Sequence, residues 1–449
     1  MPALRTLYHP SIYDPAPVPS YWEATAPADD PGWTPLEGEA SCEVAIIGGG
    51  YTGLSAALHL ARDHGIEARV LEAGGRIGWG ASGRNGGFCC LPATKMSIGG
   101  MVRRFGLDEA KRFFAAQVEG IGLTRALATE DAIDCELAGD GLFEVAHRPQ
   151  ALPGLKDYGE ALTRHFGIRT SLHSREAFRE AGHDSAEQFG ALQIHAGFAL
   201  NPLKFAVTLA QAAAKAGARL HPRSTVMRWL REGGRHLLAT DRGLLRAKHV
   251  VVAANGFMRE RLHARFDARL LPVLSNIVVT RPLTTGELMA QAWRTETPLV
   301  NARRMLFYYR KLPDDRILFG ARGDLTGRPE DGARMRQWME RRFGEVFPAW
   351  RGIETEYFWR GLVCMSRALA PSLGRLPDDP SVSYGFGYHA NGVNTAPWAG
   401  QRIAAMIAGK ETEDDLPAVV RGLPPRVLLP SLRPTYLAAA IAWYRLTDG

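Results

Sequence analysis

The sequence predicts an α/β protein of two lobes, in which a parallel sheet covered by helices carries an inserted α+β lobe built on an antiparallel sheet. Two observations predict this class. Residues 43–72 run as an apolar strand, a glycine-rich turn, a helix and a second strand, which is the order of a parallel βαβ unit. Residues 305–323, "MLFYYRKLPDDRILFGARG", alternate apolar and polar side chains on both sides of a turn, as an antiparallel hairpin does.

Length, charge and cysteine content limit the classes of function. The 449 residues suffice for two or three domains, or for one large domain with a second lobe. A net charge of +7, spread without a basic stripe, gives no sign of a nucleic-acid partner. Five cysteines without a C-x-x-C pair fit reduced thiols in a cytoplasmic protein. We expect no secretory signal, and the apolar stretch at 435–444 is too short for a transmembrane segment, so we expect a packed terminal helix there.

The glycine-rich turn lies between a strand and a helix. Residues 44–47 form a short apolar run, typical of a strand that is buried on both faces. Gly48, Gly50 and Gly53 follow in the pattern G-x-G-x-x-G. The apolar periodicity of residues 54–65 then predicts a helix that ends at a glycine.

The second strand, "ARVLEA" (68–73), places an acidic residue, Glu72, beside this motif. The helix N-terminus offers free N–H groups and a positive dipole end to a pyrophosphate, and the Glu72 carboxylate is placed to accept hydrogen bonds from ribose hydroxyls. The lysine of a phosphate-binding P-loop is absent after the glycines. The combination predicts a Rossmann-like dinucleotide-binding domain.

Three later segments favour a flavin nucleotide over a nicotinamide nucleotide. The loop "GWGASGRNGG" (78–87) can bring backbone close to a flat ring system and a cation close to phosphate, although a flexible surface loop is the alternative. Residues 201–256 read as a helix and strands that complete the first sheet. Residues 382–409 read as a strand, a glycine-rich loop and a helix that starts near Asn394 or Thr395, with Pro397 in its first turn. The positive end of that helix would stabilise negative charge on a reduced flavin.

On these segments the chain resembles the D-amino-acid-oxidase-like flavoproteins, and most closely their γ-glutamylputrescine-oxidase-like members. The shared stretches are "SYWEAT" (20–25), "IIGGGYTGLSAALHLA" (46–61), "GASGRNGG" (80–87), "WRGLVCMSRALAPSLGRLP" (359–377) and the glycine-rich C-terminal loop. The resemblance covers nearly the whole chain, and "GASGRNGG" is its most specific motif. It implies FAD bound in an extended form. Cys364 is offset from the position at which some relatives attach FAD, so we expect non-covalent binding.

The resemblance and the motif positions together imply a set of FAD-binding residues. Those expected at the pyrophosphate and ribose are Gly48, Gly50, Tyr51, Thr52, Gly53, Glu72 and Ala73. Those expected along the flavin are Gly80, Ala81, Ser82, Arg84, Asn85, Gly86 and Gly87, while Val226 is expected near adenine and Ala254 and Asn255 at the end of a strand of the first sheet. Those expected to close over the isoalloxazine are Gly387, Asn391, Gly392, Val393, Asn394 and Thr395.

The chain departs from its relatives at two places. Ala368 stands where many relatives have an aspartate, and Asn391 stands where they have a histidine, with His389 two residues earlier. The resemblance also implies domain boundaries. These are 1–99 for an N-terminal arm and the first part of the FAD-binding domain, 100–195 for the first part of the substrate domain, 196–257 for FAD binding, 258–355 for the substrate sheet, 356–425 for FAD binding and 426–449 for a C-terminal helix and tail.

The hairpin at 305–323 supplies candidates for substrate binding, because a sheet of this kind floors the substrate cavity of the relatives. Strand alternation puts Tyr308 and Arg310 on one face and Tyr309 on the other. Arg322 falls where sarcosine oxidases carry an active-site histidine, and an arginine suits bidentate binding of a carboxylate. A surface hairpin with extended arginines is the alternative.

The resemblance implies a flavin-dependent oxidation of a C–N bond in an amine or amino acid, with a carboxylate-bearing amine favoured by the arginines. Hydride transfer to the flavin would leave an imine that water hydrolyses, and O₂ would regenerate the flavin and give H₂O₂. The catalytic candidates are Tyr308, Arg322, His389 and Asn391. Two alternatives stay open: a dehydrogenase of the same fold that passes electrons to a quinone or carrier, and a flavin-binding subunit without turnover. No metal ligand set is expected.

Overall fold

The glycine motif begins at the end of a central strand, β1, in the parallel part of a mixed sheet. The computed structural model describes residues 7–27, 32–130 and 132–447. In the first sheet the strands follow the order β17-β18-β11-β1-β2-β8, and β10 and β9 extend it from β11. β1 pairs in parallel with both β2 and β11, which confirms the predicted Rossmann-like domain. The strands are β1 (Gly38–Ile47), β2 (Ala68–Leu71), β8 (Arg219–His221), β9 (Arg228–Glu232), β10 (Arg235–Ala239), β11 (Gly243–Val252), β17 (Ser372–Leu376) and β18 (Asp379–Phe386).

Four helices pack together in this lobe: α2 contacts α7 and α10, and α4 contacts α10 and α7. Helix α2 starts at the glycine motif and ends where Gly65 adopts the left-handed conformation, as predicted. Asn201 caps α7, because its Oδ1 accepts hydrogen bonds from two backbone N–H groups of the first turn. The helices are α2 (Tyr51–His64), α4 (Leu107–Thr129), α7 (Pro202–Lys215) and α10 (Gly392–Ile407).

Helix α10 starts earlier than its sequence predicts. Its first residue is Gly392 and not Asn394, so Pro397 lies inside the helix and not in the first turn. Because a proline has no N–H, the carbonyl of Val393, four residues earlier, loses its helical donor. Thr124 Oγ1 of α4 donates a hydrogen bond to that carbonyl at 3.1 Å. The neighbouring helix therefore satisfies the group that the proline leaves open.

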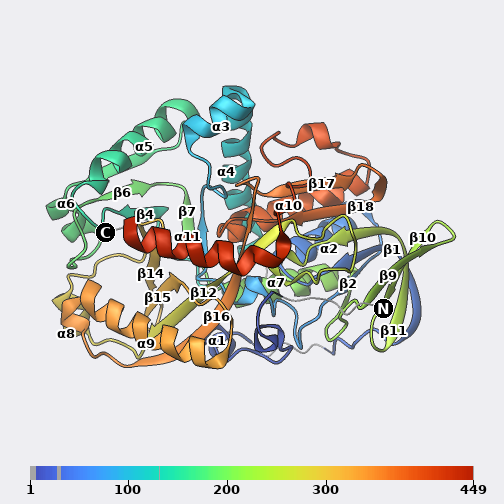
Figure 1. Ribbon diagram of the computed structural model, residues 1–449, viewed down its shortest axis with the longest axis horizontal. Helices are drawn as coiled ribbons and strands as arrows, with labels where there is room; N and C mark the ends of the chain where they lie inside the picture. The colour runs from blue at the N-terminus through green and yellow to red at the C-terminus, as the bar shows by residue number, and fades with distance from the viewer. Residues whose placement is uncertain (1–6, 28–31, 131, 448–449) are drawn as a thin grey trace.

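The second lobe is built on an eight-stranded sheet of order β16-β12-β15-β14-β13-β4-β6-β5. Its neighbouring strands are antiparallel except for β13 and β4. The predicted hairpin is present as β14 and β15. Figure 1 shows this lobe beside the first, with α5 and α6 at one end and α8 and α9 at the other. The elements are β4 (Leu142–Val145), β5 (Thr170–His173), β6 (Ala191–Ile194), β12 (Leu270–Thr280), β13 (Leu299–Asn301), β14 (Phe307–Lys311), β15 (Ile317–Arg322), β16 (Thr355–Ser366), α5 (Ala151–Phe166), α6 (Arg175–Ala181), α8 (Thr285–Ala290) and α9 (Pro329–Val346).

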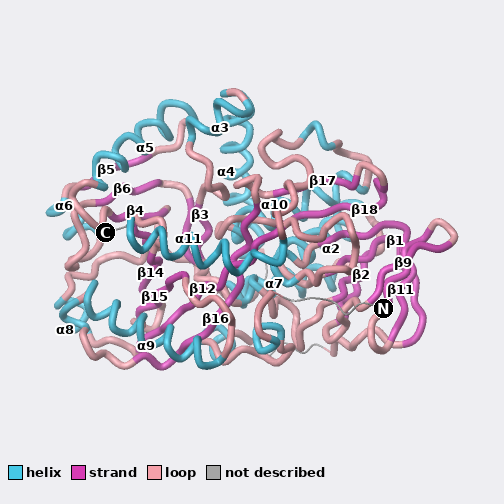
Figure 2. Tube along the Cα trace, viewed as in Figure 1, coloured by secondary structure: helices cyan, strands magenta, loops and turns pink. Residues whose placement is uncertain are grey.

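The strand pairing differs from the expected division of the chain at two places. β16 pairs with β12 along almost its whole length, so residues 356–366 belong to the second sheet and not to the FAD-binding part. Helix α4 comes from the segment 100–195 but packs in the first lobe. Figure 2 shows β12 and β16 in the middle of the molecule. The two lobes therefore share β16 and α4 as connecting elements.

The remaining elements join the lobes and cover their surfaces. They are α1 (Tyr21–Thr25), α3 (Ile98–Phe105), α11 (Arg433–Thr447) and the two-stranded ladder of β3 (Phe88–Cys90) and β7 (Gly197–Ala199). The predicted terminal helix is α11, which lies across the front of the molecule in Figure 1 and buries Leu437 and Ile441. Among the described residues, no helix has the length and hydropathy needed to cross a bilayer.

Candidate active site

A single cavity of about 1060 Å³ extends from the carboxyl ends of β1 and β2 to the face of the second sheet. We call it the central cavity. Most of the predicted site residues line it: Gly48, Gly50, Tyr51, Thr52, Glu72, Ala73, Gly80, Ala81, Ser82, Arg84, Asn85, Gly86, Val226, Ala254, Asn255, Tyr308, Arg322, His389, Asn391, Gly392 and Val393. Predicted residues from Gly48 to Val393, far apart in sequence, thus meet at one site.

At the nucleotide end the backbone of the glycine motif comes very close to β11. Gly48 has φ +111°, and a Cβ there would lie 2.9 Å from the carbonyl carbon of Ala253. Gly53 does not line the cavity. A Cβ on Gly53 would lie 2.0 Å from the Gly48 carbonyl oxygen, so this glycine allows α2 to pack on β1. The Glu72 carboxylate accepts hydrogen bonds from the N–H groups of Gly49 and Gly74, both at 2.7 Å, while burial raises its pKa.

The 78–87 loop is fixed and not a flexible surface loop. Asn85 Nδ2 donates to the carbonyls of Ala81 and Ser82 at 3.1 and 2.8 Å, and its Oδ1 accepts from the N–H of Gly87. Gly87 itself does not line the cavity. From the second lobe, Trp359 Nε1 donates to the Arg84 carbonyl at 2.9 Å. Both lobes therefore hold this loop in place.

The hydrogen-bond partners of Arg84 indicate whether the residues of this site fit FAD. Its Nε donates to the Trp79 carbonyl at 2.8 Å, and its guanidinium lies 4.5 Å from the centre of the Trp79 ring. The buried Nη2 has no hydrogen-bond partner among the described residues, and burial lowers the pKa of Arg84 to about 10. A buried cation with an open donor is costly unless an anion pairs with it. The pyrophosphate of FAD is such an anion, so the residues fit the cofactor.

Only some of the residues predicted at 387–395 line the central cavity. Asn391, Gly392 and Val393 line the cavity, but Asn394 and Thr395 do not. The latter two are turned away because their side chains hydrogen-bond Gln117 of α4, at 3.3 and 3.1 Å. Gly387 also lies outside the lining, and its N–H donates to Asn255 Oδ1 at 3.0 Å, which ties the loop to the end of β11.

The hairpin places only some of its candidates in the cavity. Tyr308 and Arg322 line it, whereas Tyr309 and Arg310 do not. Tyr309 packs in the apolar core of the second lobe. Arg310 shares the face of Tyr308 as predicted, but its Nη2 donates to the Leu200 carbonyl at 2.8 Å, outside the cavity. Arg310 is therefore no longer a candidate for carboxylate binding.

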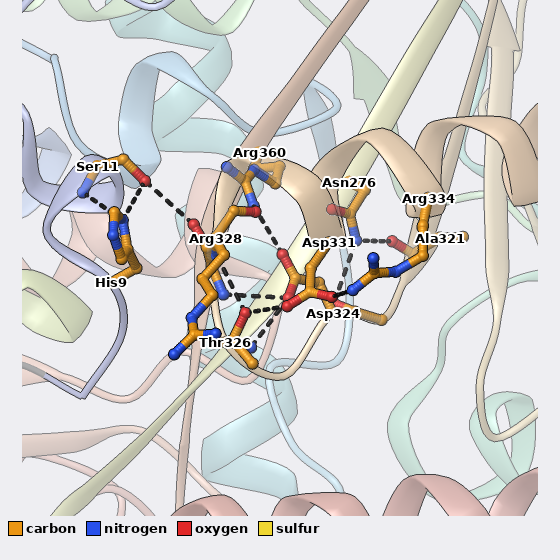
Figure 3. Close-up of polar contacts among 12 residues, drawn as sticks. His9, Ser11, Asn276, Ala321, Asp324, Thr326, Arg328, Asp331, Arg334 and Arg360 are labelled. Atoms are coloured by element: carbon orange, nitrogen blue, oxygen red, sulfur yellow. Dashed lines mark hydrogen bonds and ion pairs between the residues drawn. The ribbon is translucent and has the colours of Figure 1, made fainter.

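Figure 3 shows a polar network that includes Asn276, Ala321, Asp324 and Arg360, close in sequence or pairing to Arg322. On the opposite face of the sheet, Asn276 Nδ2 donates to the carbonyls of Ala321 and Gly323, the two residues that flank Arg322, at 3.4 and 3.2 Å. The chain then turns through Asp324, whose carboxylate pairs with Arg360 of β16 at 2.7 Å. The backbone on both sides of Arg322 is thereby held while its side chain faces the cavity.

Sequence reasoning missed several charged residues of the cavity, among them Lys95 and Glu144. Lys95 lies in the loop after β3, where no motif marks it, and Glu144 lies in β4. The signal for Glu144 was a charged residue within the apolar strand "LFEV" (142–145). Burial, and then the charge of Arg322, lower the pKa of Lys95 to about 8, although water reaches its side chain through the cavity. Burial raises the pKa of Glu144 to about 7.

Comparison with known proteins agrees with this geometry. Residues 43–406 match the model of the family described as "FAD dependent oxidoreductase" (DAO). The chain is 31% identical over 436 residues to the gamma-glutamylputrescine oxidoreductase of Escherichia coli K12, covering 96% of this chain and 98% of that protein. It is 24% identical over 387 residues to the glycine oxidase of Bacillus subtilis, covering 83% and 95%.

Solved structures show the same fold. The glycine oxidase of Geobacillus kaustophilus superposes with a TM-score of 0.67 at 24% identity, covering 83% of this chain and 96% of that one. The L-proline dehydrogenase of P. horikoshii superposes with a TM-score of 0.66 at 20% identity, covering 86% and 98%. The family match spans most of the chain, and Gly48, Gly50, Glu72 and Arg84 of the predicted FAD site line the central cavity. The chain belongs to the DAO family of FAD-dependent oxidoreductases and is an enzyme of its amine and amino-acid oxidase group.

Proposed function

We propose that this enzyme oxidises the C–N bond of a carboxylate-bearing amine to an imine, which water then hydrolyses. The observation that carries the proposal is a pair of cations, Lys95 and Arg322, that face the central cavity beyond the 78–87 loop. In the described part of the chain neither side chain makes an ion pair or hydrogen bond. Bound FAD supplies the two-electron acceptor, and O₂ then takes up the electrons to give H₂O₂.

The residues of this chain contribute binding, orientation and charge. The guanidinium of Arg322 has the planar pair of donors that binds a carboxylate. Tyr308 hydrogen-bonds Ser275 Oγ at 2.9 Å and so presents a fixed ring to the cavity. The two cations also favour the neutral form of an amine close to them, because a nearby positive charge lowers the pKa of an ammonium group. The neutral amine is the form that can lose a hydride from its carbon.

The similarity to a gamma-glutamylputrescine oxidoreductase supports an amine substrate of this class. The attachment of FAD is proposed to be non-covalent. Cys364 lines the cavity, but burial raises the pKa of its thiol, which disfavours the thiolate needed to form a bond. Denaturation of the holoenzyme is expected to release all of its FAD into the supernatant.

The test is the visible spectrum of the purified protein under anaerobic addition of single amines. Bleaching of the flavin bands by carboxylate-bearing amines is expected, and their return on admission of air would identify an oxidase. Bleaching that air does not reverse, but a quinone does, would replace the oxidase by a dehydrogenase. A flavin spectrum that no amine bleaches would refute the proposal and favour a flavin-binding subunit without turnover.

A further inference from the structure

The described residues that line the central cavity include three carboxylates, those of Glu72, Glu144 and Asp157. Glu72 lies at the nucleotide end with its oxygens bonded to backbone N–H groups, and Asp157 is an exposed residue of α5. Glu144 lies in β4 between two buried apolar residues and is itself partly buried. Within the described ranges its carboxylate accepts no hydrogen bond and has no cation within 4.0 Å. A partly buried carboxylate without a partner is costly, so its place in an apolar strand needs a functional reason.

Glu144 lies close to the loop before α10, which we assign to the flavin ring. Leu142, two residues earlier on the same face of β4, packs in one apolar cluster with Phe88 and Cys90 of β3. Burial raises the pKa of the Cys90 thiol to about 12, and the nearby charge of Glu144 adds to this rise. Cys90 Sγ lies 3.4 Å from Oδ1 of Asn391, the residue directly before α10. The carboxylate is therefore at the end of the cavity where the oxidation takes place.

Three titratable side chains from neighbouring elements lie close to Glu144: Cys90 of β3, Lys95 of the loop after it and Tyr158 of α5. Burial raises the pKa of both the thiol and the phenol, so each keeps its proton at neutral pH. Lys95 is mainly a cation there, because its pKa is about 8. The residues that face Glu144 from β13 and β6 are apolar. Among these four titratable groups, Glu144 is therefore the one that can accept a proton.

A substrate amine arrives as an ammonium ion and must lose one proton before its carbon can lose a hydride. In water an alkylammonium holds that proton about a millionfold more tightly than a glutamate carboxylate does. The cavity reduces this difference from both sides. Burial raises the pKa of Glu144 to about 7, against the opposing charge of Lys95. The positive charges of Lys95 and Arg322 lower the pKa of an ammonium close to them, so transfer of its proton to the carboxylate becomes feasible.

We propose that Glu144 accepts the proton that the substrate ammonium loses before its C–N bond is oxidised. One N–H bond breaks, an O–H bond forms on the carboxylate, and the electron pair stays on the nitrogen. The neutral amine then loses a hydride from its carbon to the bound FAD. The proton on Glu144 returns to water through the cavity that this side chain lines. The inference rests on the proposed function, because it names the proton acceptor of the same reaction.

The test is stopped-flow reduction of the flavin in the holoenzyme without O₂, at an amine concentration that saturates at each pH. The probes are glycine, L-proline and γ-glutamylputrescine, and the one that bleaches the flavin fastest is used throughout. Glu144→Gln keeps the shape of the side chain and removes the proton acceptor, whereas Glu144→Asp keeps a carboxylate. Glu160→Gln is the control, because Glu160 is an exposed carboxylate of α5.

The pH decides how much the reaction needs an acceptor. In water about one alkylamine molecule in 2,500 is neutral at pH 7, and roughly three in ten are neutral at pH 10. Glu144→Gln is therefore expected to reduce the rate at least about tenfold at pH 7 and less than about threefold at pH 10. Glu144→Asp is expected to recover most of the loss at pH 7, and the control to lose nothing. A purely structural role of Glu144 would give a loss that does not depend on pH.

The wild-type profile decides the inference even if a variant does not fold. The wild-type rate is expected to level off between pH 8 and pH 9. A rate that instead grows about tenfold with each pH unit over this range would overturn the inference, because only amine that is already neutral would then react. Equal loss in Glu144→Gln at pH 7 and pH 10, or no loss at either, would refute this role alone and leave C–N oxidation in place. A flavin that none of the three amines bleaches would overturn the proposed function together with this role.

Discussion

Gly320 determines where the Tyr308 ring lies, and Gly320→Ala is expected to move it. The ring crosses β15 directly above Gly320, and a Cβ there would lie 2.0 Å from Tyr308 Cζ. Carbon atoms in contact stay about 3.5 Å apart, so the ring must shift by roughly 1.5 Å. The Tyr308 hydroxyl now lies 2.9 Å from Ser275 Oγ, and such a shift breaks that hydrogen bond. If Tyr308 contacts the substrate as proposed, a displacement of this size reduces the rate by up to about a hundredfold.

The assay is stopped-flow reduction of the flavin by a saturating amine without O₂. Gly320→Ala is expected to reduce the rate at least tenfold while the FAD content stays that of the wild type, and to lower the free energy of unfolding by about 1–3 kcal/mol through overpacking. Gly122→Ala is the control, because no atom lies within 4 Å of its added Cβ. In a Tyr308→Ala background the second substitution should cost nothing further. A Gly320→Ala enzyme that reduces at the wild-type rate would refute the reasoning.

Three further substitutions and titrations follow from the same site. Arg84→Met should weaken FAD binding by about tenfold to a hundredfold, because it removes one charge-assisted hydrogen bond of about 1.5–3 kcal/mol. The affinity is measured by quenching of flavin fluorescence. An unchanged affinity would mean that Arg84 does not contact the pyrophosphate. Asn276→Ala should raise the KM for carboxylate-bearing amines more than for uncharged ones, since it frees the backbone around Arg322. Binding of a carboxylate-bearing amine, measured by calorimetry, should weaken above pH 8 as Lys95 loses its proton. Lys95→Met should abolish this alkaline fall, and a flat profile in the wild type would contradict the assignment.

The nucleotide half of the site could be predicted because its chemistry depends on backbone. Gly48 and Glu72 lie within one βαβ unit, where spacing along the chain fixes position in space. The hairpin could be predicted for the same reason, since its two strands are neighbours in sequence. Local pattern thus sufficed wherever the contacts that define an element are local.

The substrate half could not be predicted from local pattern. Glu144 and Tyr308 are 164 residues apart and become neighbours only through the pairing of β4 with β13 and of β13 with β14. Arg310 lies on the face of β14 that strand alternation predicts, but it does not line the cavity. Its guanidinium instead donates a hydrogen bond to the Leu200 carbonyl at 2.8 Å. Alternation gives the face of a side chain, but the neighbouring segments decide what that face meets.

The two polar residues of the loop before α10, His389 and Asn391, supply no positive charge to this site. His389 is fully buried, its Nε2 lies 3.2 Å from Ser366 Oγ, and burial together with the charge of Lys95 lowers its pKa to about 3. His389 is therefore uncharged at neutral pH and supplies no positive charge to a reduced flavin. Asn391 is neutral as well, and its side chain is engaged by the Pro92 carbonyl. The N-terminus of α10, Lys95 and the guanidinium of Arg322 are among the groups that supply positive potential to the cavity instead. The charges to which we assign the binding of an anionic substrate would thus also stabilise a reduced flavin, so that no charged histidine is needed at this end of the cavity.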